Sequence, residues 1–310
     1  MKLVTFQPAG GPPRLGAVVK GGVLDLSAAA RGRLPASMLA FLEAGPGAWD
    51  AARGLAAAPS AADVSPLAAV RLLAPLPNPP ALRDFFAFEG HAAAGARRRG
   101  ETLPPEWYQL PAYYKGNHRQ VFGPEDDIPW PSYTRRLDFE CEIACVVGMP
   151  GQDLSVEEAA RHVFGYMLFN DFSARDIQKK EMVLRMGPAK GKDFANAFGP
   201  WLVTADEVDP KRDFELAVRV NGEEWSRGRF AEQHWGFPLM LSHVSQGERV
   251  YPGDLLGSGT FHKGCGLDLD RWIKPGDVVE LEVPALGTLR NRVGVPKAPR
   301  ELNYEKEGAR

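Results

Sequence analysis

The chain has 310 residues, of which 44% are hydrophobic and 25% are charged, and its formal net charge is −2. These values are typical of a globular protein with one large domain, or with one large and one small domain. The weak negative charge gives no reason to expect a nucleic-acid partner. No window approaches the roughly 20 consecutive apolar residues of a membrane span, so no membrane partner is expected either.

The cysteines and the first residues of the sequence favour a cytoplasmic location. The chain's cysteines, Cys141, Cys145 and Cys265, form no CxxC pair and lie in apolar or glycine-rich surroundings, which indicates reduced thiols. The first residues, KLVTFQPAGG, lack the apolar core of a signal peptide. The basic run at 96–100 is more typical of a solvated lid or a carboxylate-binding loop than of a nucleic-acid patch.

The first part of the chain predicts a small module that contains β-strands. Short strands separated by glycine turns are expected at 2–6, 16–19 and 21–26. The alanine-rich residues 38–58 predict one or two helices, and a proline-dense linker follows at 74–84. We therefore place a small N-terminal domain at 1–75 and a larger domain at 76–310.

The larger domain is predicted to be mainly β with a few helices. Ser155 and Glu158 form a capping-box pattern ahead of an apolar-periodic helix, and a second helix is expected to begin at Ser173. The pair Asn221-Gly222 predicts a β-hairpin, and Pro-Gly-Asp turns separate further strands near the C-terminus. The expected fold class is therefore mainly β, of the α+β type.

The stretch LDFECEIACVVG (137–148) combines a strand pattern with unusual charge. Asp138, Glu140 and Glu142 alternate with apolar residues before the stretch becomes wholly apolar. On one strand face Glu140 and Glu142 would lie about 6.8 Å apart and repel by roughly 2.4 kcal/mol at an effective dielectric of about 20. Such a face can be a solvated edge, can hold a protonated carboxyl, or can bind a cation. Without a cation this pair should be the most strained in the protein, with Asp138 at the strand's polar end.

Two further acids could join this strand. Asp171 follows an apolar segment just before an expected helix, and Asp84 ends the proline linker. An acid before a helix is often only a cap. Together with Glu140 and Glu142, however, they would form an all-oxygen site for Mg²⁺, Mn²⁺ or Ca²⁺. The lack of a His/Cys cluster in the sequence argues against zinc.

Five segments together resemble the fumarylacetoacetate hydrolase (FAH) family in order and spacing. They are LDFECEIACVVG, VFGYMLFNDFSARDIQ, KGKDF, YPGDLLGSGT and IKPGDVVELEV. The similarity covers about residues 78–296, and residues 84–117 are similar to the long, fumarylacetoacetase-like subtype. The resemblance implies an FAH-type mixed β-sandwich/β-roll catalytic domain behind a small N-terminal domain.

The resemblance also implies a role for each matched position. The metal ligands would be Glu140, Glu142, Asp171 and Asp84, which would hold Mg²⁺, Mn²⁺ or Ca²⁺. His91, seven residues after Asp84, would be catalytic, and Lys192 would neutralise charge near the metal. The implied substrate contacts are Arg175, Gln178, Thr260, Gly259, Tyr114 and Arg99.

Three positions depart from the long subtype. Tyrosines that contact the substrate there are replaced by Phe86 and Met182, which implies a less polar substrate tail. The glutamate that orients the histidine has no clear counterpart, because the segment KGCGLDLDRW (263–272) diverges. Glu89, close to His91, is expected as its substitute.

The resemblance implies a metal-dependent hydrolase that cleaves a C–C bond in a β-diketo or acylpyruvate-type 2-oxo acid through a metal-stabilised enolate. The same enolate would serve a decarboxylase or an enol-keto isomerase, acting on oxaloacetate or on a 2-hydroxyhepta-2,4-diene-1,7-dioate type of substrate. A keto-acid-binding module without turnover is the non-enzyme alternative. The family also suggests a homodimer.

Overall fold

The structure is a computed structural model that describes residues 1–298 and 302, and its main feature is one long mixed sheet. The strands of this sheet are β1 (Lys2–Pro8), β2 (Arg14–Val19), β3 (Gly22–Asp25), β4 (Val64–Ser65), β5 (Val70–Leu73), β6 (Leu82–Phe85), β7 (Tyr113–Lys115), β8 (Val121–Phe122), β11 (Cys141–Val147), β12 (Val163–Asp171), β14 (Asn196–Thr204) and β17 (Leu255–Gly257). Their order is β4-β3-β2-β1-β14-β12-β11-β17-β6-β7, with β5 on β1 and β8 on β14.

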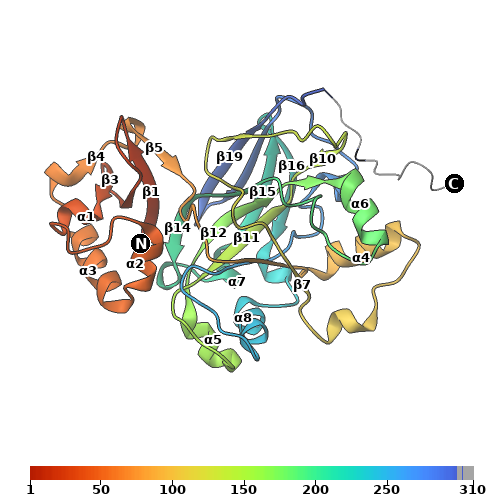
Figure 1. Cartoon of the computed structure of the whole chain (residues 1–310), viewed down its shortest axis with the longest axis horizontal. Coiled ribbons are helices and arrows are strands. Elements are labelled where there is room, and N and C mark those ends of the chain that lie inside the picture. Colours follow the sequence, from red (N-terminus) through yellow and green to blue (C-terminus); the bar gives the residue numbers. More distant parts are fainter. Residues whose placement is uncertain (299–301, 303–310) are drawn as a thin grey trace, which may run out of the picture.

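A second sheet lies beside β11 and β12 (Figure 1). Its strands are β9 (Asp127–Ile128), β15 (Glu215–Val220), β16 (Glu223–Arg229), β18 (Val278–Val283) and β19 (Gly287–Val293), in the order β16-β15-β18-β19-β9. A further short pair joins β10 (Leu137–Asp138) to β13 (Ser173–Ala174). Buried side chains of both larger sheets form one hydrophobic core. The expected fold class, mainly β with mixed sheets, is confirmed.

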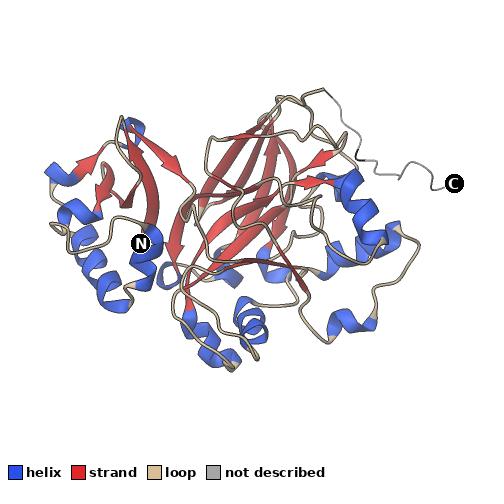
Figure 2. Cartoon of the chain, in the orientation of Figure 1, coloured by secondary structure: helices blue, strands red, loops and turns tan. Residues whose placement is uncertain are grey.

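Helices cover the ends and edges of the sheets (Figure 2). They are α1 (Leu26–Ala29), α2 (Met38–Glu43), α3 (Pro46–Ala57), α4 (Glu89–Arg98), α5 (Val156–His162), α6 (Arg175–Val183), α7 (Pro210–Asp213), α8 (Phe237–Ser245) and α9 (Gly266–Leu269). Short 3-10 turns lie at 61–63, 67–69, 105–108, 205–207 and 230–232. No helix in the described part of the chain is both long and apolar enough to cross a membrane.

The N-terminal elements form where they were expected, but they extend the main sheet. β1 pairs with β14, with Lys2 opposite Val203, so the first strands continue the sheet of the larger part. The proline-rich linker is shorter than expected, because residues 82–85 form β6 inside this sheet. The division into 1–75 and 76–310 stays a prediction.

Strand β11 is buried on both faces, which explains its apolar second half. Ile143 and Cys145 face the core shared by the two sheets. Ala144 and Val146 face a second core, to which α2 contributes Phe41. Glu142 shares the face of Ala144 and Val146, since side chains alternate along a strand. Glu142 therefore lies beyond the end of an apolar core. It is 1% exposed, so the solvated edge, one of the three alternatives, does not occur here.

Short sequence motifs correctly predicted the start of one helix and the turn of one hairpin. The Ser155–Glu158 capping box begins α5, and Asn221-Gly222 forms the turn of the β15–β16 hairpin. The helix expected from Ser173 begins instead at Arg175. The two preceding residues are extended because they pair with β10, whose Asp138 lies opposite Ser173.

Candidate active site

Three acids from neighbouring strands meet at one end of the main sheet. Glu142 comes from β11, Asp171 from the end of β12 and Asp84 from β6. β17 lies between β11 and β6, and its Gly257 pairs with Ala144 on one side and with Asp84 on the other. Each acid offers an oxygen within 4.8 Å of the others'. Three of the four predicted metal ligands therefore converge, in what we call the carboxylate cluster (Asp84, Glu142 and Asp171).

Two glycines make room for the carboxylate cluster. A Cβ on Gly257 would lie 2.2 Å from Asp84 Oδ1, so a side chain there would displace the acid. Gly259 has a φ of +72°, in the left-handed region that favours glycine. Its N–H donates to Glu142 Oε2 at 2.9 Å and to Asp84 Oδ1 at 3.2 Å. Gly259, predicted as a substrate contact, therefore orients the acids.

The carboxylate cluster holds more negative charge than its neighbours neutralise. Burial raises the pKa of Glu142 well above its usual range, and Asp84 raises it further. Burial also raises the pKa of Asp171, despite the opposing charge of Lys192. Among the described residues, Glu142 Oε1 and Asp171 Oδ1 have no hydrogen-bond partner. Unpartnered buried oxygens in an all-oxygen set suit a hard divalent cation, so these residues fit the metal that the family resemblance implies.

Lys192, predicted to be catalytic, and Tyr114, predicted to contact the substrate, both contact Asp171 of the carboxylate cluster, and their roles stay predictions. Lys192 Nζ forms ion pairs with Asp171 and Glu140. Burial alone would lower the pKa of Lys192, but these two acids raise it above its usual range. The Tyr114 hydroxyl donates to Asp171 Oδ2 at 2.7 Å. The Lys192 ammonium therefore remains a fixed positive charge at the edge of the cluster.

A second set of buried charges, the arginine group (Asp138, Glu140 and Arg175), is internally paired. Arg175 Nε donates to Asp138 Oδ2 at 2.7 Å, and Nη2 donates to Glu140 Oε1 at 2.8 Å. Its remaining nitrogen donates to Gln178 Oε1 at 2.9 Å, which places both predicted substrate contacts of α6 together. Burial would raise the pKa of Glu140, but Lys192 and Arg175 hold it well below its usual range.

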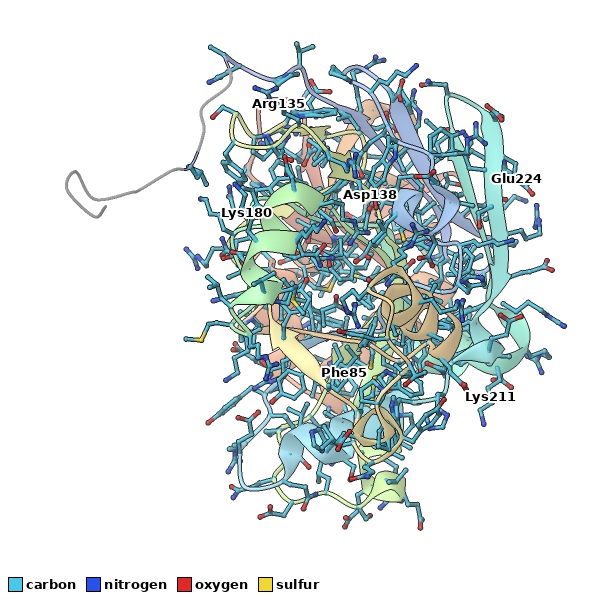
Figure 3. All side chains as sticks on the ribbon, turned by 90° about the vertical axis from the view of Figure 1, so that its right-hand side faces the viewer. Phe85, Arg135, Asp138, Lys180, Lys211 and Glu224 are labelled. Carbon is cyan, nitrogen blue, oxygen red and sulfur yellow. The ribbon has the colours of Figure 1, made fainter. Side chains whose placement is uncertain are left out.

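Two expectations about these acids were wrong. Asp138, which is labelled in Figure 3, does not lie at a polar strand end. It is fully buried, because Arg175 and the N–H groups of Gly266 and Leu267 supply its partners. Glu140 and Glu142 are not the most strained pair, since Glu140 is neutralised and the repulsion falls on Glu142. Whether Glu140 binds metal stays a prediction.

His91, on α4, lies between these charges and the start of α9. Its Nδ1 is 2.8 Å from Asp268 Oδ2, and its Nε2 is 3.8 Å from Glu140 Oε1. The ring of Phe86 meets the imidazole edge-on, with centroids 5.6 Å apart. Burial alone would raise the pKa of Asp268, but the hydrogen bond with His91 lowers it below its usual value. A charged Asp268 favours the tautomer with its proton on Nδ1, which leaves Nε2 free to accept one.

The expectation that Glu89 orients His91 was wrong. Glu89 instead accepts a hydrogen bond from the Tyr108 hydroxyl at 2.7 Å. The orienting acid is Asp268, which lies in the divergent segment 263–272. The sequence does place Asp268 shortly after the matched GSGT motif (257–260). Its spacing from that motif does not reveal that its side chain reaches His91.

The remaining predicted contacts lie at different distances from the acids. Thr260 is buried and its hydroxyl donates to the Cys141 carbonyl at 3.0 Å. Arg99 is the C-cap residue of α4, and its Nε donates to Glu101 Oε2 at 2.8 Å. Together with Phe86, Arg99 lines a surface cavity of about 270 Å³ beside the His91 helix. The structure therefore places Arg99 at an apolar cavity, with no contact to the carboxylate cluster among the described interactions.

Comparisons with known proteins agree with this architecture. Residues 81–294 match the family described as fumarylacetoacetate (FAA) hydrolase, C-terminal. A mitochondrial oxaloacetate tautomerase from Bos taurus is 31% identical over 299 residues, which cover 94% of this chain and 91% of that protein. A fumarylacetoacetase from Arabidopsis thaliana is 33% identical over 60% of this chain, and the match spans 57% of that relative's length.

A solved structure shows the same fold over nearly the whole chain. A fumarylacetoacetate hydrolase from the psychrophilic Exiguobacterium antarcticum has a TM-score of 0.74 at 26% identity, covering 95% of this chain and 100% of that one. The family match, the relatives and the shared fold lead to one conclusion. The chain belongs to the fumarylacetoacetate hydrolase family, whose named members here are enzymes.

Proposed function

We propose that the chain is a divalent-metal-dependent enzyme that hydrolyses a C–C bond in an acylpyruvate or a related β-diketo 2-oxo acid. The observation that carries this proposal is the carboxylate cluster, with its two unpartnered buried oxygens, beside the His91–Asp268 pair. Asp84, Glu142 and Asp171 would hold Mg²⁺, Mn²⁺ or Ca²⁺, with Glu140 as a fourth candidate ligand. The bound cation would supply Lewis-acid polarisation of the 2-oxo group and balance the charge of the cluster.

The residues around the cluster suit the proton transfers of this reaction. His91 would accept a proton from water through Nε2, because Asp268 holds the proton of the ring on Nδ1. The resulting hydroxide adds to the distal carbonyl, and the C–C bond breaks with its electrons moving onto the 2-oxo acid fragment. Lys192 offers a fixed positive charge for that electron density. His91 then returns its proton during product formation.

The substrate tail is proposed to be less polar than in the fumarylacetoacetase-like subtype. Phe86 and Met182 are partly exposed near α4 and α6, and neither brings a hydroxyl group. The cavity beside Phe86 is lined mainly by apolar side chains, including Trp107 and Leu110. An apolar or aromatic tail would therefore lose less hydration there than a carboxylate would.

Tautomerisation of a 2-oxo acid such as oxaloacetate is the second candidate. The supporting observation is the tautomerase from Bos taurus, which matches nearly the whole chain. This reaction needs only proton transfer between carbon and oxygen, which His91 could perform without placing a water for attack. Decarboxylation of the same acids is a third outcome, and a binding module without turnover is the non-enzyme alternative.

A substrate panel tests the proposal. The full chain is incubated with Mg²⁺, Mn²⁺ or Ca²⁺ and with acylpyruvates of polar and apolar tail, or with oxaloacetate, and products are followed by NMR. Pyruvate plus a carboxylic acid supports C–C hydrolysis; enol–keto exchange or CO₂ without cleavage contradicts it and supports the alternatives. Calorimetric binding of the keto acid without any product would support the binding module.

A His91→Ala variant tests the base. Loss of general-base assistance is expected to lower kcat by about 100-fold to 10,000-fold, while Mn²⁺ binding is retained. Full activity in this variant would contradict the role of His91. A homodimer and a cytoplasmic location remain predictions, and light scattering would measure the first.

A further inference from the structure

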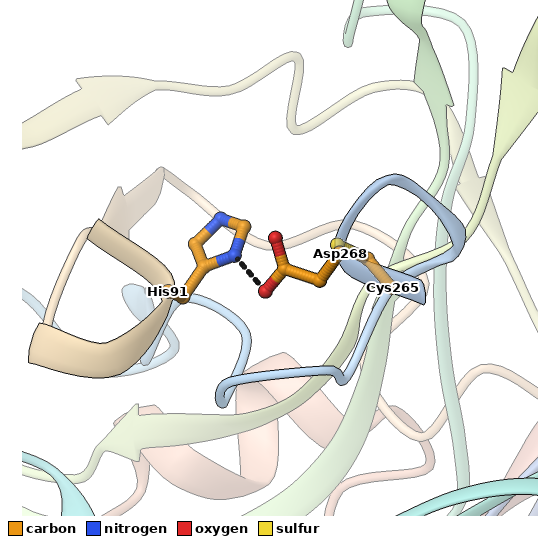
Figure 4. A group of neighbouring side chains, drawn as sticks. All are labelled: His91, Cys265 and Asp268. Atoms are coloured by element: carbon orange, nitrogen blue, oxygen red, sulfur yellow. Dashed lines mark hydrogen bonds and ion pairs between the residues drawn. The ribbon is translucent and has the colours of Figure 1, made fainter. Parts of the chain in front are cut away.

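A second group of potential metal ligands lies beside the carboxylate cluster. His91 on α4 faces Cys265 and Asp268 at the start of α9, as Figure 4 shows. Each of the three offers one ligand atom, and these atoms lie within 4.8 Å of one another. Zinc is not expected from the sequence, because no His/Cys cluster is visible in it. The fold assembles one from residues 177 positions apart.

An unsatisfied oxygen points to a missing ligand in this group. Asp268 Oδ2 is already occupied, since it lies 2.8 Å from His91 Nδ1 and accepts the Lys263 N–H at 3.1 Å. Within the described chain, Asp268 Oδ1 has no hydrogen-bond partner, although the side chain is only 1% exposed. A buried carboxylate oxygen without a partner carries a large desolvation cost.

The donor set differs in chemistry from the carboxylate cluster. It combines an imidazole nitrogen, a free thiol and one carboxylate oxygen. Mg²⁺ and Ca²⁺ avoid sulfur and nitrogen, whereas Zn²⁺ binds all three donor types, with bonds of about 2.0–2.3 Å. The three ligand atoms already lie within 4.8 Å of one another, so small side-chain movements would bring them to the spacing of a tetrahedral site. His262 Nδ1, 3.5 Å from Asp268 Oδ2, is the nearest further nitrogen and could take the fourth position in place of water.

We propose that His91, Cys265 and Asp268 form an inhibitory site for Zn²⁺ that removes His91 from catalysis. On binding, Cys265 Sγ forms a bond to the ion and its thiol proton leaves to solvent. Coordination through Nδ1 moves the remaining ring proton to Nε2, so the ring can no longer accept a proton from water there. Coordination through Nε2 blocks the same atom directly. The inhibitory effect rests on the proposed function; the metal site itself does not.

Cobalt spectroscopy tests the site independently of activity. Co²⁺ is titrated into the full chain in saturating Mg²⁺, and the thiolate-to-cobalt absorption is recorded. We expect this band in the wild type and in Cys145→Ala, which removes a second buried thiol that lies outside the group, in β11. It should vanish in Cys265→Ala. A wild type without the band, or a band that survives in Cys265→Ala, would overturn the proposal.

Inhibition by Zn²⁺ tests the consequence. In saturating Mg²⁺, Cys265→Ala should keep its basal activity but need at least about tenfold more Zn²⁺ for half-inhibition. If excess Mg²⁺ relieves the inhibition equally in both proteins, Zn²⁺ acts at the carboxylate cluster and the inhibitory role is wrong. If no 2-oxo acid is turned over at all, the proposed function fails, and the cobalt spectrum alone decides whether the metal site exists.

Discussion

The carboxylate cluster contains Glu142 and the arginine group contains Glu140, two residues away in the chain, yet the two groups balance charge differently. In the arginine group, one guanidinium donates to both Asp138 and Glu140, and backbone N–H groups complete Asp138. In the carboxylate cluster, the Lys192 ammonium pairs with Asp171, and two oxygens have no partner in the described residues. Burial is nearly complete in both.

This difference separates a structural role from a ligand-binding role. A buried acid needs a partner of opposite charge or it gives up its charge. Arg175 meets that need within the protein, so the arginine group holds β10, α6 and α9 together. The carboxylate cluster leaves the need unmet, and its raised pKa values show the result. Its missing partner is, in our account, a divalent cation.

The largest expected change in the free energy of unfolding comes from removing the cation of the arginine group. Arg175→Met leaves Asp138 and Glu140 buried without the guanidinium, which should lower the free energy of unfolding by about 3–5 kcal/mol. Arg161→Met removes an exposed i,i+4 pair with Glu157 and should cost less than about 1 kcal/mol. Urea unfolding measures both. Similar small losses in the two variants would show that the arginine group is not a structural unit.

Lys192 touches both groups, so its removal tests how they are connected. Lys192→Met should destabilise the metal-free chain by about 3 kcal/mol, because Asp171 and Glu140 lose their ammonium. Saturating Mg²⁺ should raise the melting temperature of this variant more than that of the wild type, since the cation replaces part of the lost charge. In Arg175→Met the gain from Mg²⁺ should be smaller than in Lys192→Met, since Arg175 contacts Glu140 but no acid of the carboxylate cluster. An equal rise in melting temperature in all three proteins would contradict the different charge balance of the two groups.

Glu142→Gln should have the opposite sign to Arg175→Met. The amide keeps an oxygen for the Gly259 N–H while removing one charge from the unbalanced cluster. The metal-free variant should therefore be as stable as the wild type, or more stable by about 1 kcal/mol. Urea unfolding in the presence of a chelator measures this difference. A clear destabilisation would mean that the Glu142 charge is already compensated inside the protein.

The smallest effect is a change of Mg²⁺ stabilisation with pH. The folded-state pKa values of Glu142 and Asp171 are raised by burial. The cluster's contribution to stability is therefore most favourable below the unfolded values, about 4.3 for Glu and about 3.9 for Asp, and it falls as pH rises through the folded values. Mg²⁺ must displace those protons at low pH. The melting-temperature gain from Mg²⁺ should therefore grow between about pH 5 and about pH 8. A melting-temperature gain that does not change with pH would indicate that Mg²⁺ binds outside the carboxylate cluster.

Sequence patterns predicted the parts of the molecule that local rules decide. The capping box at Ser155, the hairpin at Asn221-Gly222 and the strand that carries Glu142 all formed as expected. The motifs also identified acids that the fold brings together. Partners from distant segments could not be predicted in this way. Asp268 was missed because it lies 177 residues after His91 and no motif links the two.

The error about Asp138 and Glu140 has a similar cause. Alternation shows which acids share a strand face, but it does not show which cation packs against them. Arg175 reaches both acids only because β13 and β10 pair, which also delays the start of α6. Glu140 does repel Glu142 as expected, but burial and the charge of Asp84, on another strand, raise the pKa of Glu142 more.

Direct counting of bound Mn²⁺ tests the central claim. Electron paramagnetic resonance measures free Mn²⁺ as the metal-free full chain is titrated. We predict one tightly bound ion per chain in the wild type and in Glu157→Gln, which changes an exposed acid on α5. In Glu142→Gln the affinity of that site should fall at least about tenfold. Equal binding by Glu142→Gln and the wild type would contradict the assignment of the carboxylate cluster as the metal site.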